Sequence, residues 1–570
     1  MKVRKLVPTG RYVAAFHRRK AVLLAVLLTL FSLPGLAGQG SFEELGLELL
    51  EGTEIETQRS SLETLLSSGD RRVGPFLKAY LGGDIHRWRG QYVSYSVDSH
   101  PGEQVVLLDA FERSPRALNG KPLRATVSEL GIPLSPPRRL RRAIQGAVRV
   151  FGLLSEYPKE RLESAGRLGD SRDPAHITFL EKALSTEADE KVKYTLTESV
   201  AIIRLHHDGT PYDARLESAR LLGEMKSLRA ASIFEDLLKE IDGAGGTTAS
   251  DTARKVYSTA LGRIESYEQK VRVLGYVFAG VSLGSILILM ALGLSIIFGQ
   301  MGVINMAHGE MMMVGAYATF WVHEIFATYL PESFFNWYFV ASLPVAFVVA
   351  AAVGFVTERL IVRHLYGRPL ETLLATWGVS LVLIQAIRLL HGDNSAINNP
   401  TWLRGGAEIF HGLVLPYNRC FIIVLCFFAL LAIRVLMNRT RFGLRVRATV
   451  QNRDMADSLG VRTRRVDGMT FALGAGLAGV AGYALTLIGG ITPDMGQNYI
   501  VDSFLVVVTG GVGELLGTVG AGLGLGLLNK FLEPSTGAVW GKVLILVVVV
   551  VFIQWKPEGL FPPKGRVADA

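Results

Sequence analysis

The sequence predicts a mainly α protein in two halves, of which the second is a polytopic bundle of eight or nine membrane-spanning helices. Of the 570 residues, 49% are hydrophobic and the mean hydropathy is +0.30. From about 271 to 555, apolar runs of nearly the ~20 residues that cross a bilayer core follow one another. Residues 1–270, in contrast, are rich in Arg, Glu and Asp, which is typical of a soluble region.

The chain begins with a basic stretch and then an apolar run, AVLLAVLLTLFSLPGLA, at residues 21–37. Positive charge, a short apolar core and small residues, in this order, are typical of a signal peptide. We therefore expect residues 1–37 to be removed by cleavage after Ala37. An uncleaved anchor helix is the alternative, although the apolar core is short for a span. In both cases the region from Gly38 onward is expected outside the cytoplasm.

Residues 38–268 carry a weak internal repeat. The stretches Ser164–Leu184 and Ser218–Leu238 place small residues, glycine, an acidic residue and large apolar residues at the same offsets. This pattern resembles HEAT-type pairs of helices, in which apolar stripes are buried between neighbours. QYVSYSV (91–97) and EQVVLLDAF (103–111) predict a small β insertion. We expect an exported, helical-repeat-like domain that either contacts a partner or substrate or acts as a stabilising cap.

Metal binding and catalysis are not indicated by any residue pattern. Cys420 and Cys426 are six residues apart in one apolar run, so they do not face each other on a helix. His206, His207 and Asp208 could hold a metal, but adjacent residues point to different faces, so a solvated helix end is the favoured interpretation. The sequence contains no GxxxxGK[ST] phosphate loop and no nucleic-acid motif. We expect no cofactor, no metal, no enzymatic activity and no nucleic-acid partner.

Eight apolar segments make up the second half. The seventh is too long for a simple span, and its Gly-rich centre, TGGVGELLGTVGAGLG (509–524), predicts two shorter elements joined by a turn. This division would give nine elements instead of eight. The segments fall near residues 272–298, 303–328, 337–357, 372–391, 419–437, 468–490, 499–531 and 539–555.

Arginine in the connecting segments predicts the orientation of the bundle. Residues 434–468 carry nine arginines against three aspartates, and residues 358–371 carry three arginines. Because excess Arg marks cytoplasmic loops, both segments are expected inside, and residues 391–418, with one arginine, outside. The N-terminal domain is then periplasmic in a bacterial inner membrane. The tail from Lys556 is expected in the cytoplasm, which requires an odd number of crossings.

A polar cluster follows the first predicted span in VINMAHGEMMMVGAY (303–317). A charge at the centre of a membrane helix costs at least about 2.5–3.5 kcal/mol, so such groups usually face a cavity or a partner. Asn305, His308 and Glu310 are therefore candidates for lining a solute path or holding its gate. The alternative is structural, with His308 and Glu310 tying helices together or lying near the membrane surface.

Glycines interrupt the helical pattern in both parts of the membrane half. Transporter sites are commonly built where membrane helices are broken, because freed backbone groups there can bind solute. One interruption brackets the polar cluster, and the second lies after residue 488. We predict hinge positions at Gly302, Gly309, Gly489, Gly490, Gly510 and Gly511.

The Arg-rich segment contains RATVQNRDMADSLGVRTRRV at residues 447–466. A short helix is predicted over Thr449–Leu459 and is ended by Gly460. Asp454-Met455-Ala456, three residues and then Gly460 resemble the EAA loop of ABC importer permeases, which docks on the ATPase. Asp in place of Glu, and Met455 in place of the first Ala, depart from that motif. A plain amphipathic helix attracted to anionic lipid is the alternative.

The order of motifs over about 272–565 resembles the permeases of the branched-chain amino acid ABC importer family. The likeness is carried by ALGLSIIFGQMGVINMAHGEMMMVGAYATF, ERLIVRHLYGRPLETLLATWGVSLVLIQ, FGLRVRATVQNRDMADSLGV and FALGAGLAGVAGYALTLIGGITPDMG. Thr376-Trp377-Gly378 and the long exported extension look closer to the B-type permease of the urea branch.

The resemblance implies a transport subunit whose domain 269–570 includes a coupling loop at 438–466. It implies two separate ATPase subunits, a homologous second permease and a periplasmic solute-binding protein as partners. This chain itself would also contact membrane lipid. Urea or a short amide is the solute implied, and a branched-chain amino acid is the alternative. A membrane sensor with an exported ligand-binding domain is less favoured. A sensor should have a cytoplasmic output domain, and about fifteen residues follow the last predicted span. The candidate residues are Asn305, His308, Glu310, Thr376 and Trp377 for the solute path, and Arg447, Asp454, Ala456 and Gly460 for ATPase coupling.

Overall fold

The computed structural model describes the chain from residue 42 to residue 561, with short gaps. The chain folds into two units, Met1–Tyr267 and Glu268–Ala570. The predicted signal segment 1–37, and the predicted tail beyond residue 561, lie outside the described residues. Within residues 42–561, the structure does not describe residues 53–54, 68–69, 71, 96–103, 112–113, 116, 119–120, 131–132, 208, 245–247 and 393.

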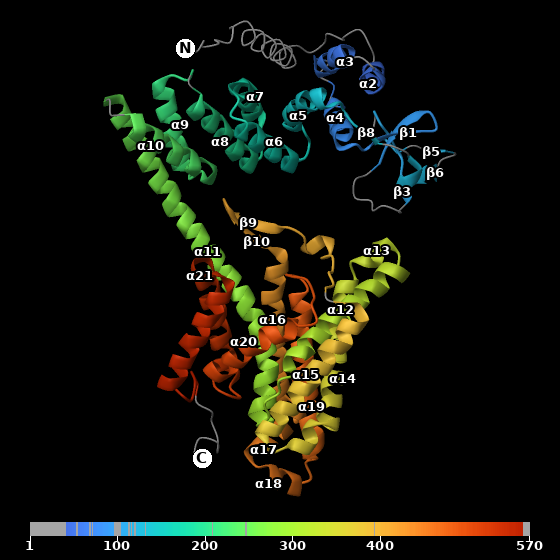
Figure 1. The fold of residues 1–570 in the computed structure, drawn as a ribbon, viewed down its shortest axis with the longest axis vertical. Helices are drawn as coiled ribbons and strands as arrows, with labels where there is room; N and C mark the ends of the chain where they lie inside the picture. The colour runs from blue at the N-terminus through green and yellow to red at the C-terminus, as the bar shows by residue number, and fades with distance from the viewer. Residues whose placement is uncertain are drawn as a thin grey trace, which may run out of the picture. The chain divides into compact units, whose positions relative to one another are not determined.

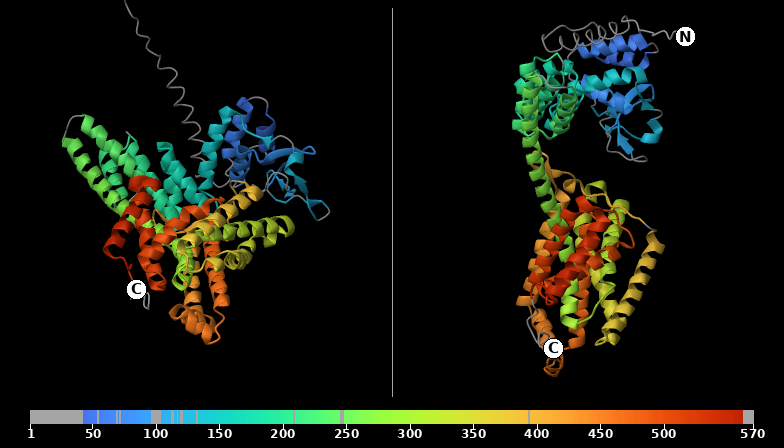
Figure 2. Two further views of the ribbon diagram at one scale, coloured as in Figure 1. Left: turned by 60° about the horizontal axis from the view of Figure 1, so that its bottom comes forward. Right: turned by 60° about the vertical axis from the view of Figure 1, so that its left-hand side comes forward.

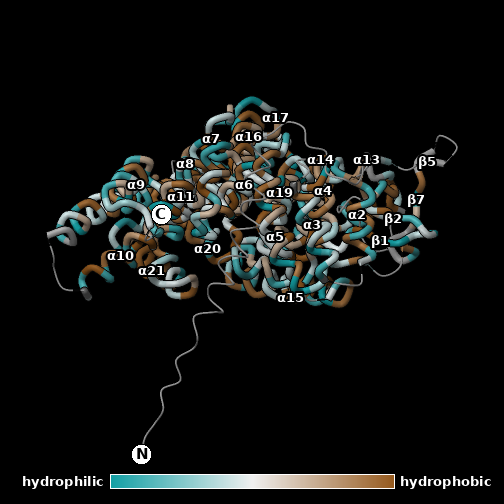
Figure 3. Tube along the Cα trace, turned by 90° about the horizontal axis from the view of Figure 1, so that it is seen from above, coloured by the Kyte–Doolittle hydropathy of each residue, from teal (hydrophilic) through white to brown (hydrophobic). Residues whose placement is uncertain are grey.

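The first unit is a succession of short helices, and most of them pack against a helix that is one or two elements away in the chain (Figure 1). Figure 3 colours these helices in alternating teal and brown, because each has a polar and an apolar face. Separate buried clusters follow one another along the chain. A stack of this kind fits the repeat pattern, and its assignment as HEAT-type stays a prediction. The helices are α2 (Phe42–Glu51), α3 (Ile55–Ser67), α4 (Val73–Gly82), α5 (Arg138–Gly152), α6 (Pro158–Asp170), α7 (Ile177–Thr186), α8 (Glu190–His206), α9 (Tyr212–Met225) and α10 (Ala231–Ala244). The packed pairs include α4–α5, α5–α6, α6–α8 and α8–α9.

Short strands separate α4 from α5, in the region where the sequence predicts a β insertion. Arg89 and Gly90, at φ +50° and +80°, form the two-residue turn between the first two strands. A four-stranded antiparallel sheet has the order β4-β2-β1-β8, and two further pairs are β3–β7 and β5–β6. The strands are β1 (Ile85–Trp88), β2 (Gln91–Ser94), β3 (Gln104–Val106), β4 (Leu108–Asp109), β5 (Ala117–Leu118), β6 (Lys121–Pro122), β7 (Arg124–Thr126) and β8 (Pro133–Leu134).

The second unit is a helical bundle. α11 begins in the first unit and ends in the second. The long helices are α11 (Thr248–Met301), α12 (His308–Tyr329), α14 (Tyr338–Leu360), α15 (Pro369–His391), α16 (Tyr417–Arg439), α19 (Thr463–Leu485), α20 (Met495–Gly510) and α21 (Leu515–Trp555). Short elements in the connections are α13 (Glu332–Phe335), α17 (Arg441–Gln451), α18 (Arg453–Ser458) and the hairpin β9 (Gly406–Phe410) and β10 (Leu413–Pro416).

Six helices among the described residues are long and apolar enough to cross a membrane: α11, α14, α15, α16, α19 and α21. The sequence predicts eight or nine spans, and α12 and α20 are not among these six. The predicted turn inside segment 499–531 is present, since α20 ends at Gly510 and α21 begins at Leu515. α21 is bent at Gly537, which has φ +78°.

α11 and α19 are the most buried of the six candidate spans. The apolar windows of α11 and α19 are 78% and 83% buried, whereas those of α15, α16 and α21 are 22% or less. α12, α14 and α19 pack against one another. Small residues permit this close approach, because a Cβ on Gly482 of α19 would overlap the backbone oxygen of Met312 in α12.

The connection between α16 and α19 differs from its prediction. Instead of one helix over Thr449–Leu459, two helices meet at Asn452, whose φ of −157° ends α17. The Asn452 side chain then accepts a hydrogen bond of 2.9 Å from the Met455 N–H and so begins α18. α17 and α18 lie at one end of the bundle, and the β9–β10 hairpin lies at the other (Figure 1 and Figure 2).

Gly482→Ala should destabilise the bundle, because the added methyl group meets the backbone of Met312 and no flexible side chain. Overpacking of this kind costs about 1–3 kcal/mol. Thermal unfolding of the protein purified in detergent should show a lower midpoint. Gly378→Ala is the matched control, because no atom lies within 4 Å of a Cβ at this helical position. Equal midpoints for the two variants would contradict the close approach of α12 and α19.

Candidate functional site

The polar cluster lies where one helix ends and the next begins: Asn305 precedes α12, and His308 and Glu310 lie in its first turn. α11 ends at Met301, Gly302 adopts φ +64°, and α12 begins only at His308. The predicted span 303–328 is therefore wrong at its start. The reason is local: glycine tolerates the left-handed conformation that ends α11, and the Asn305 side chain accepts a 3.0 Å hydrogen bond from the Ala307 N–H. The segment between the two helices, 302–307, is called the helix break below.

Asn305 belongs to the helix break, and Thr376 of α15 contacts the break. Asn305 is 1% exposed, and its Nδ2 is buried without a hydrogen-bond partner among the described residues. The Met306 N–H donates to Thr376 Oγ1 at 3.1 Å, which joins the break to α15. Trp377, the next residue, is 48% exposed, so the structure brings Thr376 to the break and leaves Trp377 on the outer face of α15.

Glu310 lies at the start of α12 and faces α15 and α20. Its Oε1 accepts a 2.7 Å hydrogen bond from Ser380 of α15. Its Oε2 is buried without a hydrogen-bond partner in the described part of the chain. A Cβ on Gly496 of α20 would overlap this oxygen, so the absence of a side chain at Gly496 makes room for the carboxylate.

His308 faces a different neighbour. It is fully buried, and its Nε2 lies 3.1 Å from the backbone oxygen of Met290 in α11. Because a carbonyl oxygen only accepts, Nε2 carries the hydrogen, and Nδ1 is left with a lone pair and no described partner. His308 thus ties α12 to α11, whereas Glu310 points to α15 and α20. The structure does not bring these two predicted site residues together.

Three hydroxyl residues of α15 form a stripe along the face that meets the helix break: Thr372, Thr376 and Ser380. They are spaced four residues apart and at most 2% exposed, although most of α15 is open. The sequence reasoning missed Ser380 and Gly496. The four-residue spacing from Thr376 was a signal that could have identified Ser380. No sequence pattern indicated Gly496, because its role depends on how α12 and α20 approach.

The predicted hinge glycines have different environments. Gly309 is helical, and a Cβ there would lie 2.5 Å from the Gly496 oxygen, so it serves close packing. Gly489 and Gly490 precede Ile491, which exchanges two backbone hydrogen bonds of 2.8 and 2.9 Å with Ser395.

The other glycine pair ends α20. Gly510 is its last residue, and Gly511 has φ +100°. The backbone N–H of Phe561 donates to the Gly510 oxygen at 3.3 Å. The turn that follows also reaches the first helix, since a Cβ on Gly299 of α11 would lie 2.6 Å from the Cα of Gly513.

The predicted coupling residues are spread over α17, α18 and the residues after them. Arg447 Nη1 donates to the Met437 oxygen at 2.6 Å, which fixes α17 to the end of α16. Asp454 is exposed, whereas Ala456 is 4% exposed and packs inward. Gly460 has φ +85° and turns the chain toward α19. Two apolar side chains of this connection, Met455 and Leu459, are 58% and 77% exposed.

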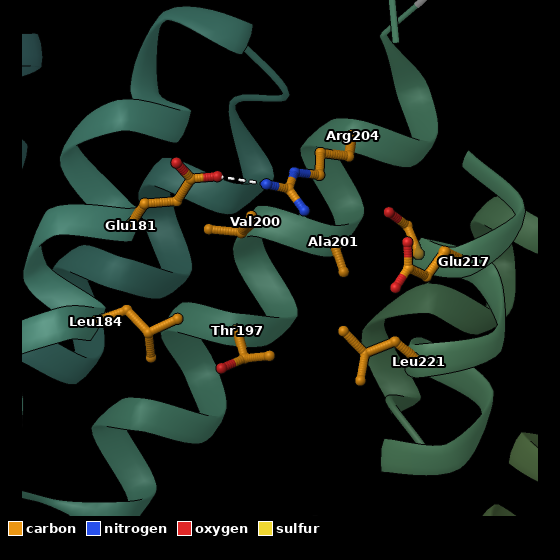
Figure 4. Close-up of a pocket in the computed structure, with 9 residues that line it drawn as sticks. Glu181, Leu184, Thr197, Val200, Ala201, Arg204, Glu217 and Leu221 are labelled. Atoms are coloured by element: carbon orange, nitrogen blue, oxygen red, sulfur yellow. Dashed lines mark hydrogen bonds and ion pairs between the residues drawn. The ribbon is translucent and has the colours of Figure 1, made fainter. Parts of the chain in front are cut away.

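A separate cavity of about 280 Å³ lies in the first unit between α7, α8 and α9 (Figure 4). An ion pair of 2.5 Å between Arg204 and Glu181 borders it, and Leu184 and Leu221 are among its apolar walls. His206 Nε2 lies 3.1 Å from Arg172 Nη1. No group of side chains suited to hold a metal occurs among the residues that are described, and Asp208 lies outside them.

Known proteins match the second unit. The family model for the branched-chain amino acid transport system permease component matches residues 276–553. The permease LivH of Salmonella typhimurium is 30% identical over 300 residues, covering 51% of this chain and 96% of LivH. BraD of Pseudomonas aeruginosa is 29% identical, covering 49% of this chain and 93% of BraD.

A second kind of permease is more distantly similar. LivM of Escherichia coli is 25% identical, covering 49% of this chain and 69% of LivM. No solved structure matches the chain. The matched family region begins at residue 276, so the whole of the first unit precedes it. With 96% of LivH covered at 30% identity, the chain belongs to the family of branched-chain amino acid transport system permease components.

Proposed function

We propose that this chain is the permease subunit of an ATP-driven importer in a bacterial inner membrane, and that its solute is urea or a short amide. The permease role follows from the family, and the solute, partners and orientation are the proposal. The observation that carries the solute assignment is Glu310, three residues after the helix break, a buried carboxylate with one oxygen bound to Ser380 and one oxygen without a partner among the described residues.

The groups at the break match a neutral solute rich in N–H donors. Urea presents four N–H donors and one carbonyl acceptor. Glu310 Oε2 and the hydroxyl stripe of α15 offer acceptors, and Asn305 Nδ2 offers a donor. Residues 302–310 include no Lys or Arg that would pair with a solute carboxylate. These features favour an amide over an amino acid at this position.

A branched-chain amino acid is the second candidate. The names of LivH and BraD assign those relatives to high-affinity branched-chain amino acid transport systems. The start of a helix can also bind a carboxylate through free backbone N–H groups, and α12 begins at the break. The amino acid therefore needs a direct comparison with urea.

Partners are proposed from the same relatives and from the connecting segments. LivH and LivM of Escherichia coli are both named as permease proteins of a high-affinity branched-chain amino acid transport system, and the chain is similar to both. We propose a homologous second permease, two ATPase subunits and a periplasmic solute-binding protein. The exposed Met455 and Leu459 of the α16–α19 connection offer an apolar surface to an ATPase.

The arginine pattern supports the proposed orientation. The α16–α19 connection is Arg-rich and the α15–α16 connection is not, and they occupy opposite ends of the bundle. The first predicted span would then start on the periplasmic side, with the N-terminal domain outside and the C-terminal tail in the cytoplasm. No chemistry on the solute is proposed, and ATP hydrolysis belongs to the partner subunits.

Uptake of labelled urea and labelled leucine should separate the two solute candidates. In a strain lacking this gene, ATP-dependent urea uptake should fall, and leucine uptake should stay the same. Expression of the gene from a plasmid should restore urea uptake. A fall in leucine uptake with unchanged urea uptake would instead support the amino acid and overturn the urea assignment.

Glu310→Gln should lower solute uptake while leaving the subunit in the membrane, because the amide keeps the size of the side chain but loses an acceptor. A hydrogen bond to a charged group contributes about 1.5–3 kcal/mol, so we expect a loss of about ten-fold or more. Trp377→Leu is the control on the exposed face of the same region and should keep most of the uptake. Wild-type uptake by Glu310→Gln would show that the carboxylate is not part of the path.

A further inference from the structure

A second set of buried charges lies where α14 ends and α19 begins. The side chains of Glu358 and Asp467 are both 0% exposed. Gly468 allows this proximity of the helices, because a Cβ there would lie 2.9 Å from Glu358 Oε2. Buried carboxylates are strongly unfavourable unless they are paired, so the contacts of these two groups restrain the elements that provide the partners.

Each carboxylate is paired with an arginine from another element. Arg453, the first residue of α18, forms an ion pair and a hydrogen bond with Asp467. Arg363 of η4 (Val362–Leu365) places Nη2 3.6 Å from Glu358 Oε2. α18 is thereby fixed to α19, and the α14–α15 connection is fixed to α14.

Tyr366 joins the two pairs. Its hydroxyl donates to Glu358 Oε1 at 2.8 Å, and the Arg453 guanidinium carbon lies 5.2 Å from the centre of its ring. Burial, together with the neighbouring carboxylates, raises the pKa of Tyr366, so the hydroxyl stays protonated and remains a donor. Arg453 of α18 thus contacts α19 directly and α14 through this one tyrosine.

From these contacts we propose that Arg453 and Asp467 form a latch that makes α19 follow any displacement of α18. The proposal rests on the proposed function, since it requires an ATPase that moves the α17–α18 connection. If α18 moved alone, Asp467 would stay buried without its arginine, which is strongly unfavourable. Arg453 and Asp467 are positioning residues and touch no solute.

Close packing extends this restraint to the solute path. α19 and α12 approach so closely that Gly482 lies against the backbone of Met312. Because α12 begins at the helix break and carries Glu310, a displacement of α19 reaches the proposed solute groups without a flexible intermediate.

Each buried carboxylate also keeps one oxygen, Asp467 Oδ1 or Glu358 Oε2, that accepts no hydrogen bond in the described part of the chain. The paired arginine can therefore move from one oxygen of the carboxylate to the other during such a movement.

The test uses the complete importer, with its ATPase subunits and binding protein, reconstituted in proteoliposomes. The measured quantity is the number of labelled urea molecules taken up per ATP hydrolysed, with labelled leucine in a parallel arm. Arg453→Gln should lower this ratio about five-fold or more, the range expected when coupling between sites is lost, while ATP hydrolysis continues. Arg453→Lys keeps the charge and should retain most of the coupling. Glu533→Gln, which removes the carboxylate of the Lys530–Glu533 pair on α21, is the control and should keep the ratio.

A double variant separates a latch from a purely structural ion pair. Arg453→Gln with Asp467→Asn leaves no unpaired charge, so the folding penalty of the single variant is removed. If the pair is a latch, the double variant reaches wild-type abundance and stays uncoupled. If the pair only stabilises the fold, the double variant recovers the wild-type ratio, and the latch is overturned. Should the wild-type assembly itself take up neither solute with ATP, the proposed function fails, and that outcome is distinct from a failure of the latch.

Discussion

Carboxylates buried inside an apolar bundle need partners, and this requirement governs the arrangement of the membrane unit. Glu310, Glu358 and Asp467 are each at most 1% exposed. Each is held by a residue from another part of the chain: Ser380 for Glu310, Tyr366 and Arg363 for Glu358, and Arg453 for Asp467. These contacts connect α12 to α15, α14 to the α14–α15 connection, and α19 to α18. The charges that look least suited to lipid are therefore the ones that link these elements to one another.

Small residues make the second contribution to this arrangement. Gly496 leaves space for the Glu310 carboxylate, and Gly468 does the same for Glu358. Gly482 brings α19 against the backbone of α12. Helix association in a membrane relies on such close packing, since lipid provides no hydrophobic drive between helices. The glycines and the buried carboxylates act together, because the charges are shielded only where the backbones approach closely.

The sequence was informative where the signal is local or compositional. Apolar runs located most of the long helices, and the Gly-rich stretch after residue 508 correctly indicated a turn. Other features depend on tertiary contacts. Trp377 was grouped with Thr376, but neighbours on a helix face different directions, and the structure leaves Trp377 exposed. The predicted helix over Thr449–Leu459 missed the break at Asn452, whose side chain competes for the backbone. Arg453 was counted only as a signal of orientation, because nothing in the sequence shows that it meets Asp467 fourteen residues later.

The central claim is that the α16–α19 connection faces the cytoplasm, where an ATPase can act on it. The direct measurement is labelling of Met455→Cys in whole cells with a membrane-impermeant thiol reagent, in a variant whose Cys420 and Cys426 are replaced by Ser. Met455 is 58% exposed, and Ile409→Cys, 56% exposed on β9 at the opposite end of the bundle, is the matched position. We expect Met455→Cys to be labelled only after the inner membrane is permeabilised, and Ile409→Cys to be labelled before. Labelling of Met455→Cys with the inner membrane intact would contradict the account.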